Sequence, residues 1–267
     1  MRLWLFDFDG TLSSLVDDRN AAVMHPACVS MLKGLSQSKT DQVAIISSRT
    51  LEDVLQRVPL KDVIVGGNSG MEWQLPGGCR VSLGSSRKEA LLTRRGELMP
   101  AIEKLGRKDG FEIEDKHWSV AIHIDKKRRQ SLDKTVQTIV AWAMREKITL
   151  YRGPDVLEIQ FLDGFNKSMG ATFLAELLKI DTIKDQIIYS GDDENDAVAM
   201  WWAIMAGGKA IMVGARFDLP GAIYVKDQEA LAETVQMLTE HDRNTSLKYG
   251  PVHEIAGGLS GTDRQSS

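Results

Sequence analysis

Cysteine is scarce in this chain, which has only Cys28 and Cys79 among its 267 residues. Neither stands in a CxxC pair or in a cluster with histidines at the spacing of metal ligands. The sequence therefore argues against a redox or zinc site, and we expect both thiols to be buried or incidental.

Long hydrophobic runs are also absent, because no apolar stretch approaches the roughly 20 residues that cross a bilayer. The chain reaches a carboxylate at Asp7, before the apolar core of a signal peptide is complete. These absences predict a soluble, cytoplasmic protein that has no membrane partner.

Positive charge is not in excess, since 33 Lys and Arg residues stand against 37 Asp and Glu residues, giving a formal net charge of −4. Proteins that bind nucleic acid through its phosphates usually carry a basic domain or stripe. We therefore expect no nucleic-acid partner, although a small anion remains compatible with this balance. The 43% of hydrophobic residues is typical of a globular protein.

Short apolar runs of strand length alternate with helical stretches along the chain. The runs lack polar alternation, which is typical of parallel strands covered on both faces in α/β proteins. A helix is predicted to begin at Thr50, whose hydroxyl can cap it, and a second one covers 169–178. The strand candidates are residues 3–6, 43–46, 63–65, 187–189 and 210–213.

The segment 84–161 has a different pattern. Its run 117–124 alternates apolar and polar residues, which indicates a strand covered on one face only. Such strands form open-faced sheets, so the segment reads as an inserted α+β unit. Its other candidates are helices over 88–105 and 132–145 and strands over 111–114 and 156–159.

Together these patterns predict an α/β protein with a parallel sheet and an insertion. We place the core at residues 1–83 and 162–245, and the inserted unit at 84–161. A polar, Gly- and Ser-rich stretch at 246–267 is predicted to be a weakly ordered tail.

Two aspartates, Asp7 and Asp9, follow the first predicted strand in the run DFDGTL. In an open parallel sheet the ligand crevice lies beyond the carboxyl ends of the strands, so both carboxylates are expected to face it. Carboxylates this close repel each other unless a cation such as Mg²⁺ neutralises them. The alternative is an Asp-Gly turn that only closes the strand.

A denser acidic group follows the strand candidate at 187–189, where the run DDEND holds four carboxylates in five positions. An EF-hand is a poor interpretation, because Ala197 stands where that loop needs glycine. The group is therefore either part of a metal site with Asp7 and Asp9 or a solvated acidic turn.

Lys167 and Ser47 complete the candidate set. Lys167 begins a predicted helix. A cation next to the positive end of the helix dipole is unfavourable by about 0.3–1 kcal/mol, unless an anion is also held there. Ser47 directly follows the strand at 43–46 and offers a hydroxyl to an anion of the same kind. A simple turn or capping serine is the alternative for Ser47.

In this order the motifs resemble those of phosphohydrolases in the haloacid dehalogenase (HAD) superfamily. The matching positions are the DxDGT run at 7–11, Ser47, Lys167 and the GDxxxD run at 191–196. The resemblance implies a Rossmann-like parallel-sheet core and an inserted cap domain that determines substrate specificity.

The resemblance also implies residue roles. Asp7 is then the nucleophile that attacks phosphorus, and Asp9 protonates the leaving alcohol and later activates water. Ser47 and Lys167 hold the phosphoryl oxygens. The implied cofactor is Mg²⁺, and the implied metal-site residues are Asp7, Asp9, Asp192, Asp193 and Asp196.

Within the superfamily the chain is most similar to trehalose-6-phosphate phosphatases. Segments 7–18, 43–49 and 67–72 resemble theirs, and Glu114-x-Lys116 followed by His123 resembles their disaccharide-gripping pattern. Two departures are Asn195-Asp196-Ala197 in place of the usual Thr-Asp-Glu, and Asp125 in place of an arginine after the cap histidine. The implied substrate-binding residues are Asp7, Phe8, Asp9, Asn68, Glu114, Lys116, His123 and Glu158.

The expected function is therefore Mg²⁺-dependent removal of phosphate from trehalose 6-phosphate, by a protein expected to be a monomer. A phosphatase for sucrose phosphate or a glycosyl-3-phosphoglycerate has the same core chemistry, and a non-catalytic sugar-phosphate sensor is a further alternative. From the residues alone, Glu114 and Lys116 could equally form a solvated turn, and His123 could be a strand histidine with its hydrogen bonds satisfied.

Overall fold

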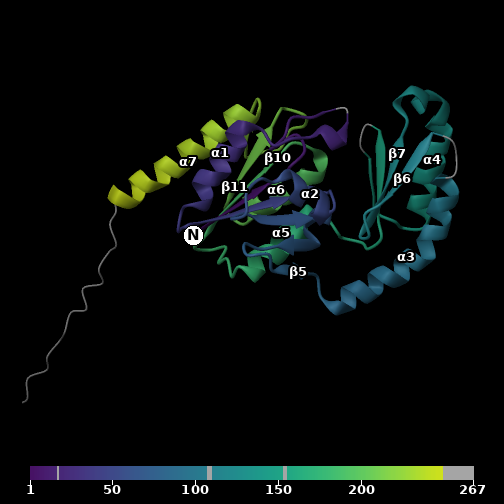
Figure 1. Ribbon diagram of the computed structural model, residues 1–267, viewed down its shortest axis with the longest axis horizontal. Helices are drawn as coiled ribbons and strands as arrows, with labels where there is room; N and C mark the ends of the chain where they lie inside the picture. The colour runs from purple at the N-terminus through teal and green to yellow at the C-terminus, as the bar shows by residue number, and fades with distance from the viewer. Residues whose placement is uncertain (17, 107–109, 153–154, 249–267) are drawn as a thin grey trace, which may run out of the picture.

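The computed structural model describes residues 1–16, 18–106, 110–152 and 155–248. Figure 1 shows a larger lobe with the N-terminal strands and α7, and a smaller lobe with β6, β7 and α4. No helix in these ranges is both long enough and apolar enough to cross a membrane.

An eight-stranded sheet forms the centre of the larger lobe, in the order β12-β11-β10-β1-β2-β3-β4-β5. Neighbours from β12 to β3 run parallel, whereas β4 and β5 form an antiparallel hairpin at the edge. The bounds are β1 (Arg2–Phe6), β2 (Asp41–Ile46), β3 (Ile64–Gly67), β4 (Glu72–Gln74), β5 (Arg80–Ser82), β10 (Gln186–Gly191), β11 (Lys209–Val213) and β12 (Ala222–Val225).

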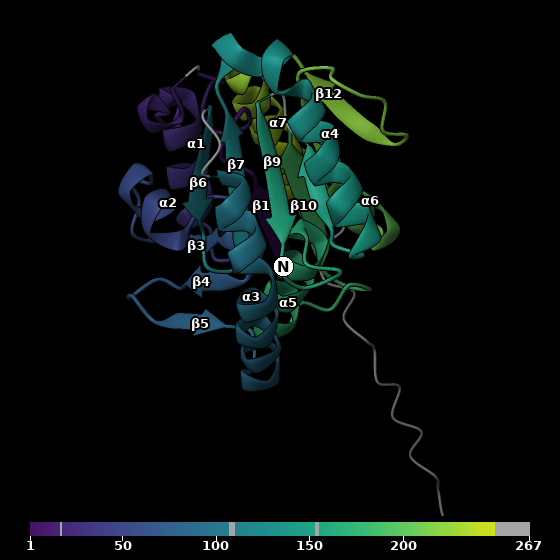
Figure 2. The same ribbon diagram turned by 90° about the vertical axis from the view of Figure 1, so that its right-hand side faces the viewer.

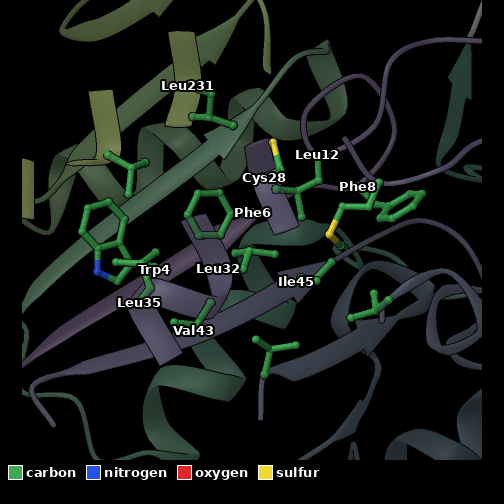
Figure 3. Packing of buried hydrophobic residues seen from close by; sticks show 14 of the residues in the cluster. Trp4, Phe6, Phe8, Leu12, Cys28, Leu32, Leu35, Val43, Ile45 and Leu231 are labelled. Atoms are coloured by element: carbon green, nitrogen blue, oxygen red, sulfur yellow. The ribbon is translucent and has the colours of Figure 1, made fainter. Parts of the chain in front are cut away.

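Helices cover both faces of this sheet. Trp4 and Phe6 of β1 pack with α1, α2 and α7 on one face (Figure 3), whereas Leu3 and Leu5 pack with α5 and α6 on the other. Burial on both faces explains the continuous apolar runs of the sequence. The bounds are α1 (Pro26–Ser36), α2 (Leu51–Arg57), α5 (Lys167–Leu177), α6 (Glu194–Met205) and α7 (Gln228–Lys248), with short 3-10 helices η1 (Arg19–Ala21) and η2 (Asn68–Gly70).

The smaller lobe contains a four-stranded antiparallel sheet in the order β6-β7-β9-β8, here called the cap sheet. Ile122 and Ile159 turn to one face and pack with Ile139 of α4, while alternate residues form a polar face. In Figure 2 the cap sheet lies in front of β1 and β10. The bounds are α3 (Ser85–Gly106), β6 (Phe111–Asp115), β7 (Ser119–Ile124), η3 (Lys126–Arg128), α4 (Arg129–Arg145), β8 (Leu150–Arg152) and β9 (Val156–Gln160).

The predicted α/β class with a parallel-sheet core and an inserted cap is confirmed. Thr50 caps α2 as expected, by accepting a hydrogen bond from the Asp53 amide. Cys28 is buried, Cys79 is exposed, and both are free thiols. The exact domain boundaries stay a prediction.

Some elements were not predicted. Strands β4, β5 and β8 have only three residues each, too few to show a periodic pattern. Helix α7 continues to Lys248, beyond the predicted start of the tail at 246, and the tail positions 249–267 lie outside the described residues.

Two glycines set the position of α5, the helix that begins with Lys167. Gly70 adopts a φ of +83°, and a Cβ built on it would lie 2.6 Å from the Gly170 Cα. A Cβ on Gly170 would lie 2.2 Å from the backbone oxygen of Ser69. This backbone contact allows α5 to approach the loop after β3 more closely than any side chain permits.

We expect Gly170→Ala to lower the free energy of unfolding by roughly 1–3 kcal/mol, because the new methyl group must push two backbones apart. Urea denaturation measures the change. Gly96→Ala is the matched control, since open space surrounds Gly96 in α3. It should be neutral or stabilising by about 0.5–1 kcal/mol, and equal effects of the two substitutions would contradict the argument.

Candidate active site

The candidate site lies where β10, β1 and β2 end side by side. Asp192 follows β10, Asp7 follows β1 and Ser47 follows β2. The chain order reverses on the two sides of β1, and such a switch point is where open α/β sheets bind ligands. Asp7 is held there by its amide, which donates to the Ser190 carbonyl at 2.9 Å.

Gly10 allows the turn after β1 to lie against β10. Its φ is +85°, and a Cβ on it would fall 2.1 Å from Asp192 Oδ2. Gln228 Nε2 fixes the same turn from α7, by donating to the Gly10 carbonyl at 2.9 Å. The glycine was visible in the sequence, whereas no sequence signal pointed to Gln228.

Three buried carboxylates, those of Asp7, Asp192 and Asp196, converge here, with an oxygen of each within 4.8 Å of the others. Lys167 Nζ donates to Asp7 Oδ1 and to Asp196 Oδ1, each at 2.6 Å. The structure therefore brings the predicted DxDGT run, Lys167 and the GDxxxD run into one cluster.

Negative charge exceeds positive charge in this cluster. Burial and the nearby Asp196 raise the pKa of Asp7 well above its usual range. Burial, Asp196 and Asp193 raise the pKa of Asp192 to about 7. Burial alone would lower the pKa of Lys167, but Asp196 and Asp7 raise it, so the ammonium stays charged.

The donor set suits a hard divalent cation, because carboxylate oxygens are the ligands that such ions prefer. Asp7 and Asp192 offer these oxygens directly. Both oxygens of Asp196 already accept hydrogen bonds. Its Oδ1 accepts from Lys167 and from the Tyr189 hydroxyl. Its Oδ2 accepts from the amides of Asp192 and Asp193. Asp196 therefore orients the cluster.

The side chains of the other two predicted metal-site residues, Asp9 and Asp193, have other partners. Asp193 caps α6, where its Oδ1 accepts from the amides of Asn195 and Asp196. The Asp9 carboxylate pairs with Arg49, as described next. Arg216, which was not predicted, reaches Asp192 Oδ2 at 3.0 Å.

Arg49 is the main residue that sequence reasoning missed. Its Nε and Nη2 donate to the two oxygens of Asp9 at 2.6 and 2.7 Å, and its Nη1 donates to Asp53 at 2.6 Å. Burial would lower the pKa of Arg49, but Asp9 and Asp53 raise it. Its place two positions after Ser47, at a strand end, was the only available signal.

The Phe8 side chain does not face the site, so a contact between Phe8 and a substrate stays a prediction for its backbone alone. It is fully buried in the core, and the Arg49 guanidinium lies over its ring at 5.9 Å. Alternation along the chain turns Phe8 inward while Asp7 and Asp9 turn outward. Only its backbone remains available to a ligand.

Ser47 and Asn68 lie beside Arg49. Ser47 is buried, and its Oγ accepts from the Arg49 amide at 3.1 Å. The Asn68 amide donates to the Arg49 carbonyl at 2.6 Å, and its Nδ2 donates to Glu72 at 3.1 Å. The buried Asn68 Oδ1 has no hydrogen-bond partner among the described residues.

The cap sheet gathers the four predicted cap residues. Lys116 Nζ and Ser119 Oγ donate to Glu158 at 3.1 and 2.8 Å. Glu114 lies 2.9 Å from His123 Nε2 and also pairs with Arg19, a core residue that was not predicted. Register places Glu114 and Glu158 on either side of Ala121, on the polar face of the sheet.

Solved structures share this architecture. The C-terminal domain of a Candida albicans trehalose-6-phosphate phosphatase aligns with a TM-score of 0.67 at 19% identity, covering 90% of this chain and 92% of that one. A haloacid dehalogenase-like hydrolase from Bacteroides thetaiotaomicron aligns at 0.63 and 15%, covering 89% and 99%. The fold of this chain is therefore that of haloacid dehalogenase-like hydrolases with a cap domain.

Sequence comparison identifies the family. The trehalose-phosphatase family model matches residues 5–205, so the chain belongs to the trehalose-phosphatase family. A trehalose-phosphate phosphatase from Mycobacterium ulcerans is 31% identical over 214 residues, covering 78% of this chain and 53% of that protein. A probable trehalose-phosphate phosphatase from rice, Oryza sativa, is 28% identical over 254 residues, covering 90% and 66%.

The expected family resemblance is therefore confirmed. This chain spans only about half the length of the Mycobacterium relatives.

We expect the metal-free protein to lose stability as the pH rises from about 4 to 7. Folding raises the pKa of Asp192 from 3.8 to about 7, so in this window the folded chain keeps a proton that the unfolded chain has released. The shift corresponds to roughly 4 kcal/mol at most. Thermal melts in a chelator across this range measure the slope.

Asp192→Asn should flatten that slope, whereas Asp62→Asn, a change on an exposed loop, should keep it. An unchanged slope in Asp192→Asn would show that the raised pKa of this carboxylate does not cause the loss of stability with pH.

Proposed function

We propose that the protein is a Mg²⁺-dependent phosphomonoesterase that releases phosphate from trehalose 6-phosphate through an aspartyl-phosphate on Asp7. The observation that carries the proposal is the Asp7 carboxylate, buried at the switch point and held by Lys167 at 2.6 Å. The names of the Mycobacterium and rice relatives support the substrate.

In the first step an Asp7 oxygen attacks phosphorus while the bond between phosphorus and the sugar oxygen breaks. Asp9 donates a proton to that oxygen, so the sugar leaves as an alcohol. Lys167 and the Ser47 hydroxyl bind the phosphoryl oxygens and stabilise their charge. These two roles need one carboxylate that stays fixed and one that moves. The Asp9 side chain is more exposed than that of Asp7, at 39%.

In the second step water attacks the phosphorus of the aspartyl-phosphate. Asp9, now ionised, accepts the proton of that water, and the bond between Asp7 and phosphorus breaks. Inorganic phosphate leaves, and both aspartates return to their starting states.

A magnesium ion would be held by the side chains of Asp7 and Asp192 and by the Asp9 carbonyl. When bound, it neutralises the carboxylates and draws charge from the phosphoryl oxygens. Asp193 and Asp196 keep the loop after β10 in place through their amide hydrogen bonds.

The polar face of the cap sheet supplies the sugar contacts in this proposal. Hydrogen bonds to hydroxyl groups require fixed donors and acceptors, and the pair between Lys116 and Glu158 fixes both of its members at 3.1 Å. Glu114 and His123 form a second fixed pair on the same face. In this proposal the disaccharide contacts both pairs while its phosphate lies at Asp7.

We expect Asp7→Asn to abolish phosphate release, because an amide oxygen cannot form the aspartyl-phosphate. The measurement is phosphate release from trehalose 6-phosphate, sucrose 6-phosphate and glucosyl-3-phosphoglycerate, run in parallel. Asp133→Asn, on the exposed side of α4, is the control and should behave as the parent. Sustained turnover by folded Asp7→Asn would refute the covalent mechanism. Equal rates on the three esters would refute the assignment of trehalose 6-phosphate as the substrate.

We expect Mg²⁺ to raise the melting temperature of chelator-treated protein, because binding to the folded state alone stabilises it by about 2.7 kcal/mol at a hundredfold excess over Kd. Asp192→Ala should remove this shift by deleting one ligand. Glu240→Ala on α7 is the control for a lost carboxylate away from the site. A shift that survives in Asp192→Ala would place the cation elsewhere.

A further inference from the structure

The helix η1 is tied to the core through its main chain. Arg49 Nη2 donates to the Arg19 carbonyl at 2.7 Å, and Arg57 Nη1 donates to the Asn20 carbonyl at 3.0 Å. Asp53 accepts hydrogen bonds from both arginines, at 2.6 and 2.9 Å, and so fixes their side chains. The position of η1 therefore does not depend on the Arg19 side chain.

The Arg19 side chain instead reaches the cap sheet. Its Nη1 and Nη2 donate to the two different oxygens of Glu114 on β6. His123 Nε2 on β7 lies 3.1 Å from Arg19 Nη1 and 2.9 Å from Glu114. Burial would raise the pKa of Glu114, but His123 and Arg19 hold it well below its usual range, so the carboxylate stays ionised.

Two covalent connections join the two sheets, from β5 into α3 and from β9 into α5, and Arg19 belongs to neither of them. Helix α3 follows β5, the edge strand, whereas η1 follows β1 in the centre of the sheet order. Figure 2 shows α3 beside β5 at the lower end of the cap sheet. A cap hinged at these two connections can move relative to β1 unless a contact such as that of Arg19 holds it.

We propose that Arg19 is a specificity-determining residue that holds the sugar-facing strands β6 and β7 over Asp7. This inference rests on the proposed phosphatase function. A substrate whose alcohol extends to the cap gains contacts only when these strands are in place, whereas a small ester reacts at Asp7 without them. The planar guanidinium makes both hydrogen bonds to Glu114 at once, which a lysine cannot do.

The test compares trehalose 6-phosphate with p-nitrophenyl phosphate in the full-length protein with Mg²⁺. We expect Arg19→Ala to lower kcat/KM for the sugar phosphate at least tenfold more than for the small ester, mainly through KM. Arg19→Lys should fall between the parent and Arg19→Ala. Arg80→Ala is the matched control, because Arg80 pairs with Glu52 on the core at 2.8 Å and makes no described cap contact.

Hydrogen–deuterium exchange gives a readout that does not need turnover. Amides of β6 and β7 should exchange faster in Arg19→Ala than in the parent or in Arg80→Ala, while those of β1 and β2 should not change. An Arg19→Ala substitution added to Glu114→Ala should cause little further acceleration, because the carboxylate that accepts from both guanidinium nitrogens is already missing.

The outcomes separate the two proposals. Equal losses on both esters, with unchanged exchange in β6 and β7, overturn the role of Arg19 and leave the phosphatase function intact. A parent protein that hydrolyses neither ester overturns the phosphatase function, and the exchange experiment then decides alone whether Arg19 holds the cap. Faster exchange throughout the core sheet would mean general destabilisation and would also refute the inference.

Discussion

The charge balance around Lys167 is the constraint on which the rest of the structure depends. Lys167 is 2% exposed, and its ammonium group lies between two carboxylates that are 160 and 29 positions away in the chain. A buried ammonium without partners would be very unfavourable, and so would buried carboxylates without a cation. Each group therefore requires the fold that brings the others to it.

That requirement explains features far from the chemistry. Lys167 opens α5, where the helix dipole is unfavourable to a cation. Asn166 caps this helix, because its side-chain oxygen accepts hydrogen bonds from the amides of Ser168 and Met169. The approach of Gly70 to Gly170 then sets how deeply α5 can lie against the core. Charge, capping and backbone contact act on one helix, and together they place a single nitrogen atom within hydrogen-bond distance of Asp7.

How much of the site the sequence could predict depends on whether a residue is marked by its neighbours in the chain or only by distant partners. The residues at the ends of β1, β2 and β10 follow apolar runs directly, so Asp7, Ser47 and Asp192 could be assigned from local pattern. The parallel order of the strands then brings them together. Motif membership does not tell which way the Phe8 side chain points, whereas alternation along the chain does, and it turns this side chain into the core.

The arginines could not be assigned in this way. Arg19 begins the short helix η1, and Arg49 and Arg216 stand in loops, so no periodicity marks them. Their partners are 95, 40 and 24 positions away. An ion pair between distant positions becomes visible only when the topology is known. The sequence therefore predicted the carboxylates of the site and missed the cations that hold them, apart from Lys167.

Arg49 has a consequence for the order of events in the proposed reaction. It holds both oxygens of Asp9, and proton transfer to a sugar oxygen requires one of them to face the phosphate. One partner must therefore move. Arg49 is 7% exposed and is also fixed by Asp53, whereas the Asp9 side chain is 39% exposed. In the proposed mechanism the more exposed Asp9 side chain would rotate to the substrate, while Arg49 keeps its contact with Asp53.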